Sequence, residues 1–137
     1  MTDDQTIEEK LIDKIALKNG LTLKLSDRSK RVAGDRWFVC FSARIEVDVK
    51  PEYFEGEHAP DIPFDDIRAA VGDKVTYRYE KTRKFIAETE KVEVFNGLKE
   101  RFLKATLEYI SSADFPSKLI LKQYREALGE LKQMKFG

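Results

Sequence analysis

The feature that most constrains this chain is one long alternating segment, residues 36–49. Every second side chain in it is apolar: Trp37, Val39, Phe41, Ala43, Ile45, Val47 and Val49. Because successive side chains of a β-strand point to opposite faces, this spacing predicts one long strand with its apolar face on the core. The other face begins with Phe38 and Cys40 and then becomes polar. We therefore expect the first half of the strand to be buried on both faces, and the second half to be exposed to solvent on one face.

Residues 7–19 fit two interpretations. A capping-box pattern followed by apolar residues at helical spacing favours a helix. Alternation, followed by an Asn-Gly pair and a second alternating run, favours a β-hairpin. We adopt the hairpin, because a three-residue loop at 18–20 pairs Leu17 with Leu21 and gives Gly20 the left-handed conformation of a G1 bulge.

Further elements follow from similar patterns. Alternation predicts a strand over 74–82, and a short helix over 66–71 has Asp65 as its cap and Gly72 as its left-handed end. Helical spacing predicts a helix over 88–111 and another over 116–135. The first of these two long helices has an apolar arc of about 220° when residues advance by 100° each. The arc comprises Val92, Val94, Phe95, Leu98, Phe102, Leu103, Ala105, Leu107, Tyr109 and Ile110.

Together these patterns predict an α+β fold. It is a four-stranded antiparallel meander sheet with a short crossing helix and a C-terminal antiparallel helix hairpin packed on one face. The 137 residues suit a single domain, with residues 1–9 as a flexible N-terminal tail and 51–67 as a long acidic loop.

Charge and cysteine content exclude several classes of protein. With 25 basic and 25 acidic residues the chain is formally neutral, which argues against general nucleic-acid binding. One cysteine excludes an internal disulfide framework and suits a reducing compartment. No apolar run approaches the roughly 20 residues that span a bilayer, and the start is acidic. We therefore expect a cytoplasmic protein without a membrane partner.

The acidic loop 51–67 contains six carboxylates, the only histidine (His58) and no Lys or Arg. Such a set could supply ligands for a divalent cation. Its spacing matches no EF-hand, however, and Asp65 is assigned to the helix cap. We favour a solvated, proline-stiffened loop that protects a sheet edge, and we expect no metal.

A basic segment leads into the start of the long strand and contains Arg28, Lys30, Arg31 and Arg36. Guanidinium groups on a loop can hold a phosphate, so this segment is the candidate site for a small anionic ligand. In the strand alternation, the adjacent Trp37 lies on the same face as the core residues. We interpret it as a structural anchor.

The residues that could act in catalysis are few. A serine or cysteine nucleophile needs a base, and His58 is the only imidazole. Cys40 lies within the long strand among phenylalanines and is expected to be a buried, inert thiol. No glycine-rich phosphate loop is present. We expect a non-catalytic protein without a cofactor.

The remaining class of function is interaction with protein. The broad helical arc has one edge at Leu103, Leu107 and Ile110, and the acidic loop carries Tyr53 and Phe54. Exposed apolar groups of this kind form docking surfaces. We therefore expect a protein-interaction or assembly module that pairs with itself as a homodimer or with another protein, the alternative being the anionic-ligand site.

Overall fold

The computed structural model describes residues 9–56 and 60–136, so the expected N-terminal tail lies outside it apart from Glu9. In chain order the elements are β1 (Lys10–Ala16), β2 (Thr22–Asp27), β3 (Lys30–Ala33), β4 (Arg36–Asp48), η2 (Pro51–Phe54), α1 (Phe64–Val71), β5 (Lys74–Ala87), η3 (Glu88–Glu90), α2 (Lys91–Ile110) and α3 (Phe115–Phe136). An antiparallel sheet followed by two long helices confirms the α+β fold. Over the described part of the chain, no helix has both the length and the apolar character to span a membrane.

The chain divides into two compact units. Of the described residues, the first contains 9–45 and 78–111, and the second contains 46–56, 60–77 and 112–136. The boundaries fall inside β4 and β5, which therefore contribute to both units. A single domain stays a prediction.

The sheet has the antiparallel order β1-β2-β4-β3, with β5 also paired to β4. β2 and β3 follow one register along β4, because Asp27 pairs with Phe41 and Lys30 with Phe38. The Arg28 amide between them still donates to the Cys40 carbonyl, at 3.0 Å. β2 and β3 thus lie in line beside β4. The predicted antiparallel sheet is confirmed, but it has five strands instead of four, because β3 was not predicted. β5 continues to Ala87, beyond the predicted end at residue 82.

The structure decides between the two interpretations of residues 7–19 in favour of the hairpin. Ile15 pairs with Leu23, and the Leu17 amide donates to the Leu21 carbonyl at 2.8 Å. Gly20 has a φ of 88°, the left-handed conformation that the three-residue loop requires. The hairpin prediction is confirmed down to its register.

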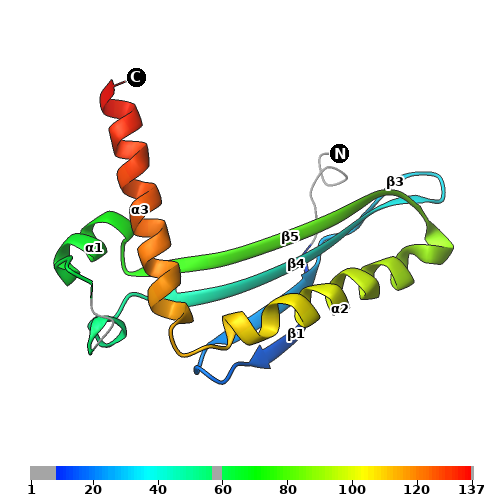
Figure 1. Cartoon of the computed structure of the whole chain (residues 1–137). Helices are drawn as coiled ribbons and strands as arrows, with labels where there is room; N and C mark the ends of the chain where they lie inside the picture. The colour runs from blue at the N-terminus through cyan, green and yellow to red at the C-terminus, as the bar shows by residue number, and fades with distance from the viewer. Residues whose placement is uncertain (1–8, 57–59, 137) are drawn as a thin grey trace. The chain divides into compact units, whose positions relative to one another are not determined.

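In the first unit, α2 lies along one face of the sheet (Figure 1). The fully buried Phe41 ring packs between β5 and α2, with ring centroids 6.2 Å from Tyr79, 5.8 Å from Phe95 and 5.4 Å from Phe102. The middle of the α2 arc therefore faces the sheet. Other parts of the arc remain exposed: Val92, Leu107 and Tyr109.

The second unit is built around the start of α3. Phe115 is fully buried, and its ring lies 5.7 Å from that of Tyr77. The Gln123 side-chain amide donates to the Thr76 carbonyl at 2.9 Å, which fixes α3 to β5. Within this unit α1 and α3 are also in contact, and α1 buries Ile67.

The prediction that Asp65 caps the short helix is wrong. The helix begins earlier, at Phe64, with Pro63 in the cap position and no side-chain cap bond. Asp65 falls in the first turn, where a carboxylate still favours the positive end of the helix dipole. The predicted terminator is confirmed, because Gly72 has a φ of 87° and its amide donates to the Arg68 carbonyl.

The aromatic cluster yields a stability prediction. Phe102→Ala removes a ring that is 2% exposed and packed on Phe41 and Tyr79, so it leaves a cavity. We expect a loss of about 3–5 kcal/mol in the free energy of unfolding, measured by chemical denaturation. Leu128→Ala, at an exposed position on α3, is the control and should cost far less. Equal losses in the two variants would contradict the assigned core.

Candidate binding groove

A groove lies in the first unit between the sheet and the first half of α2. Its volume is about 530 Å³, within the roughly 300–1,000 Å³ range of small-ligand sites. Strands β1, β2 and β4, the β2–β3 connection and helix α2 all contribute to its lining. The residues are Lys10, Ile12, Asp27, Ser29, Trp37, Lys91, Val92, Phe95, Asn96 and Lys99.

Trp37 is held in the groove wall by polar neighbours. Its indole N–H donates to Glu88 Oε1 at 3.1 Å, and the Lys91 ammonium lies 3.6 Å from the ring centroid. The Arg31 guanidinium lies 5.8 Å from the same ring and also pairs with Glu88, at 3.3 Å. The ring is half-buried, so Trp37 is an anchor at the edge of the core, whereas Val39 and Phe41 on the same strand face are fully buried.

The apolar part of the wall is open to water. Val92 is 64% exposed and Ile12 is 41% exposed. Phe95 lies between them and the core, because it lines the groove and also packs edge-on against Phe41. Ile12 sits at a β-bulge in β1, which interrupts the pairing of this strand with β2.

The charged side chains of the groove are mostly cationic. Three lysines, Lys10, Lys91 and Lys99, face a single carboxylate, Asp27. Asp27 Oδ1 accepts a hydrogen bond from the Ser29 amide at 2.8 Å, so it also shapes the break between β2 and β3. The groove lining therefore combines apolar side chains with an excess of positive charge.

The predicted basic loop is in fact the tip of a β-hairpin, since β3 and β4 pair there and Gly34, with a φ of 55°, makes the turn. Sequence reasoning missed β3 because turn-forming residues and charges surround a run of only four residues. Alternation along β3 then points Lys30 and Arg31 to opposite faces of the sheet.

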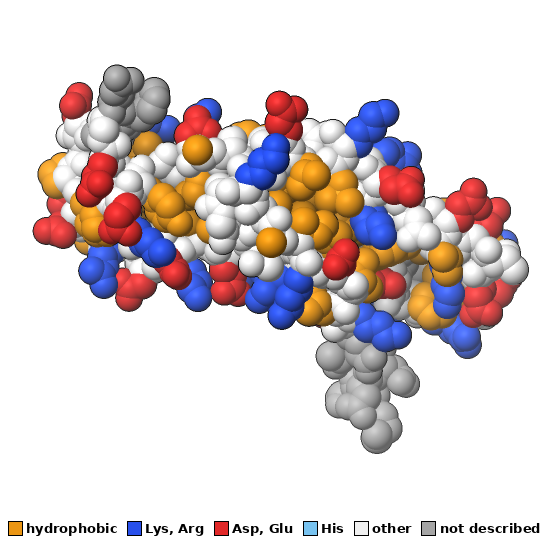
Figure 2. Space-filling model, turned by 90° about the horizontal axis from the view of Figure 1, so that it is seen from below, with side chains coloured by type: hydrophobic (Ala, Val, Ile, Leu, Met, Phe, Trp, Pro, Cys, Tyr) orange, Lys and Arg blue, Asp and Glu red, His pale blue; other side chains and the backbone are white. Residues whose placement is uncertain are grey.

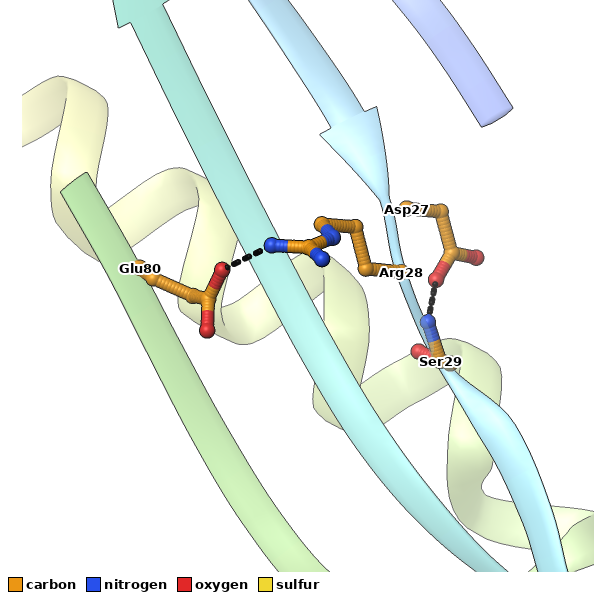
Figure 3. A network of polar contacts seen from close by, with 4 residues as sticks. All are labelled: Asp27, Arg28, Ser29 and Glu80. Atoms are coloured by element: carbon orange, nitrogen blue, oxygen red, sulfur yellow. Dashed lines mark hydrogen bonds and ion pairs between the residues drawn. The ribbon is translucent and has the colours of Figure 1, made fainter. Parts of the chain in front are cut away.

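The four basic residues do not converge on one site, and none of them lines the groove. Arg28 reaches across β4 to Glu80 at 2.7 Å, on the side of the sheet away from α2 (Figure 3). Arg31 pairs with Glu88, and Arg36 lies 3.7 Å from Asp35. Lys30 is exposed. Anion binding by this set stays a prediction, and three of its members have carboxylate neighbours.

The predicted interaction residues differ in their exposure. Leu107 is 38% exposed and Leu103 is half-buried, but Ile110 is fully buried. The prediction that Ile110 lies near solvent is wrong, because the end of α2 is fastened to the β1–β2 turn. There the Asn19 side-chain amide donates to the Ile110 carbonyl at 2.8 Å.

Aromatic residues of the acidic loop pack against one another. Tyr53 and Phe54 are half-buried in the short 3-10 helix η2. The ring centroids of Phe54 and Phe64 lie 6.0 Å apart. Among the described residues no group of acidic, His or Cys side chains is arranged to hold a metal ion. His58 lies outside those residues.

Cys40 is buried on the face of β4 opposite to Phe41. Burial, reinforced by the nearby Glu80 carboxylate, raises the pKa of this thiol from 9.0 to about 11. The prediction of a buried thiol is confirmed, and its protonated state at neutral pH makes it a poor nucleophile.

The groove residues themselves were not predicted as a site. They come from the start of β1, the break after β2, the start of β4 and the first turns of α2, so no local motif joins them. The only indication of this site in the sequence was the beginning of the apolar helical arc, where Val92 and Phe95 lie near Lys91 and Lys99.

Comparison of the chain with protein-family models, curated proteins and solved structures gives no significant match.

The raised pKa of Cys40 gives a second prediction. At pH 8 its thiolate fraction should be about a hundredfold below that of an ordinary cysteine, since the pKa is about 11 instead of 9.0. Reaction with a thiol-directed disulfide reagent should therefore be slow in the folded protein and fast in denaturant. Rapid native-state labelling would contradict this assignment, and Cys40→Ser controls for other sites of modification.

Proposed function

We propose that this chain is a non-catalytic protein-interaction module and that the groove receives its partner. The observation that carries the proposal is the exposure of Val92 and Ile12 within a concave surface bordered by lysines. The proposed occupant is a protein segment that presents an apolar side chain between carboxylates. Figure 2, which views the side of the molecule that carries α2, shows apolar side chains at the surface with both basic and acidic side chains around them.

The apolar contribution follows from solvation. Removing apolar surface from water is favourable by about 25 cal/mol per Å², and Val92 and Ile12 can contribute surface of this kind. Single exposed apolar side chains are common, but a group of them in a groove marks a binding surface. Phe95 adds a rigid wall, because its ring is fixed by packing against Phe41.

The charges determine which partner fits. Lys10, Lys91 and Lys99 give the groove a positive field that Asp27 only partly offsets. Carboxylates on the partner complement this field and raise the association rate, an effect that added salt reduces. Lysine stems can also cover apolar surface of the partner while their ammonium groups stay in water.

The hydroxyl in the groove supports binding rather than catalysis. Ser29 Oγ accepts a hydrogen bond from the Cys40 amide at 2.9 Å, where a backbone carbonyl would normally bind. This hydroxyl thus completes the ladder between β4 and its neighbour. The groove lining contains no histidine or cysteine that could act with it as a base or nucleophile.

The chain contains a segment with the proposed chemistry, which supplies a probe. The aromatic residues Tyr53 and Phe54 of η2 are flanked in sequence by the exposed carboxylates Glu52 and Glu55. A synthetic peptide of residues 49–56, VKPEYFEG, therefore carries aromatic groups and negative charge of the required kind.

Trp37 is the only tryptophan and lines the groove, so its fluorescence reports on binding. Titration with the peptide should change Trp37 emission saturably, and the change should weaken as salt is added. Val92→Glu should reduce the affinity at least about tenfold, because it removes apolar surface and repels the carboxylates.

Val32→Glu is the matched control, since Val32 is 53% exposed but lies outside the groove. It should leave the titration unchanged. Absence of any Trp37 response, or an equal loss in both valine variants, would contradict the groove as the interaction site.

Self-association through α2 is a separate prediction, which now rests on Leu107 and Leu103 without Ile110. In a homodimer, Leu107→Glu should give a folded monomer, because a carboxylate in a dry interface has no partner. Light scattering over a concentration series measures this. A wild-type chain that remains monomeric at high micromolar concentration would exclude the homodimer.

A further inference from the structure

A row of four cationic side chains crosses the sheet on the face away from α2. Lys14 of β1 pairs across the strands with Lys24 of β2, and Lys24 pairs with Arg44 of β4. Arg78 of β5 lines the same hollow as Arg44. All four residues belong to the first unit. Neighbouring strands lie about 4.8 Å apart, so the row extends over roughly 14 Å.

Strand alternation assigns this row to the face opposite the aromatic core. Its members on β2 and β4 alternate with Leu23, Leu25, Ala43 and Ile45, which are all buried. Lys14 and Arg78 are exposed, whereas Lys24 and Arg44 are half-buried. The charges are therefore fixed by the same register that forms the core, and a ligand in solvent can reach them.

These cations lack the partners that other basic residues of the sheet have. Arg28 pairs with Glu80 at 2.7 Å and Lys74 with Glu46 at 3.3 Å. None of the four residues in the row makes an ion pair with any residue that the structure describes, and the buried Nε of Arg44 has no hydrogen-bond partner there. Like charges directly opposite one another destabilise a sheet, so the row opposes folding unless an anion binds.

The arginine end of the row is a small hollow of about 200 Å³. Arg28, Ser42, Arg44 and Arg78 supply its donors, and Glu9 and Glu80 also line it. Glu80 is engaged by Arg28, on the side of the sheet drawn in Figure 3. Arg44, Arg78 and the Ser42 hydroxyl are the groups left to meet a ligand oxygen.

We propose that this row binds a ligand with several adjacent phosphate groups, which place one end at Arg44 and Arg78 and extend toward Lys24 and Lys14. Guanidinium groups match phosphate oxygens with two parallel hydrogen bonds, and lysines add point charges along the row. A single carboxylate or phosphate would meet only one or two of these cations. The one aromatic residue that lines the hollow is Tyr79, and its ring packs against Phe41 and Phe102 in the core. That ring is not available for a base to stack on, which favours an oligophosphate over single-stranded nucleic acid.

Calorimetric titration of the full chain with inorganic tripolyphosphate tests the proposal. We expect saturable binding that is at least about tenfold tighter than binding of orthophosphate at the same ionic strength. Lys24→Gln/Arg78→Gln should weaken tripolyphosphate binding about tenfold or more. The same double variant should melt at a higher temperature than the wild type without ligand, because it removes like-charge repulsion.

The control is Lys104→Gln/Lys122→Gln, which removes the same charge from exposed positions on α2 and α3. It should leave tripolyphosphate binding unchanged. No binding by the wild type, or an equal loss in both double variants, would overturn the site. Equal affinity for a polyglutamate of matched charge would replace phosphate with carboxylate as the ligand, and tighter binding of an oligonucleotide would assign the row to nucleic acid. Either result would overturn the oligophosphate proposal.

Discussion

The first unit depends on how the Phe41 side chain is enclosed. Its ring is fully buried and contacts Tyr79 from β5 and both Phe95 and Phe102 from α2. Sheet and helix are therefore joined through one aromatic cluster. Phe95 extends this cluster to the surface, where it becomes a wall of the groove. The shape of the proposed binding surface is thus set by core packing, which gives a partner a preorganised site.

Much of the fold could be predicted because its patterns are local. The alternation of residues 36–49 specifies β4, and the Gly20 turn specifies a hairpin whose register is confirmed. Errors arose where tertiary context decided the outcome. Asp65 is not the cap because the helix starts two residues earlier than predicted, at Phe64. Ile110 is fully buried at the end of α2, where the side chain of Asn19, from a turn distant in sequence, binds its carbonyl.

The groove and the cationic row could not be predicted, because both depend on pairing between distant strands. Lys14, Lys24, Arg44 and Arg78 are ordinary surface charges in the sequence, and only the register aligns them. The same register places the aromatic side chains of the core on one face of the sheet and the cations of the row on the other. A slip of one residue in β2 would exchange these faces. The Ser29 hydroxyl, bound to the Cys40 amide, helps maintain the register where β2 gives way to β3.

The discontinuity of the first unit has a consequence for synthesis. Its sheet residues up to Ile45 are made first, but α2, which covers their core face, follows the whole segment 46–77. The bond from Asn19 to Ile110 closes the unit only when the end of α2 is present. Contacts between such distant parts of a chain form slowly, because a long loop must be closed first. During translation, the apolar face of β2 and β4 therefore stays uncovered until α2 has been synthesised. In that interval the exposed apolar surface of the nascent chain favours aggregation and chaperone binding.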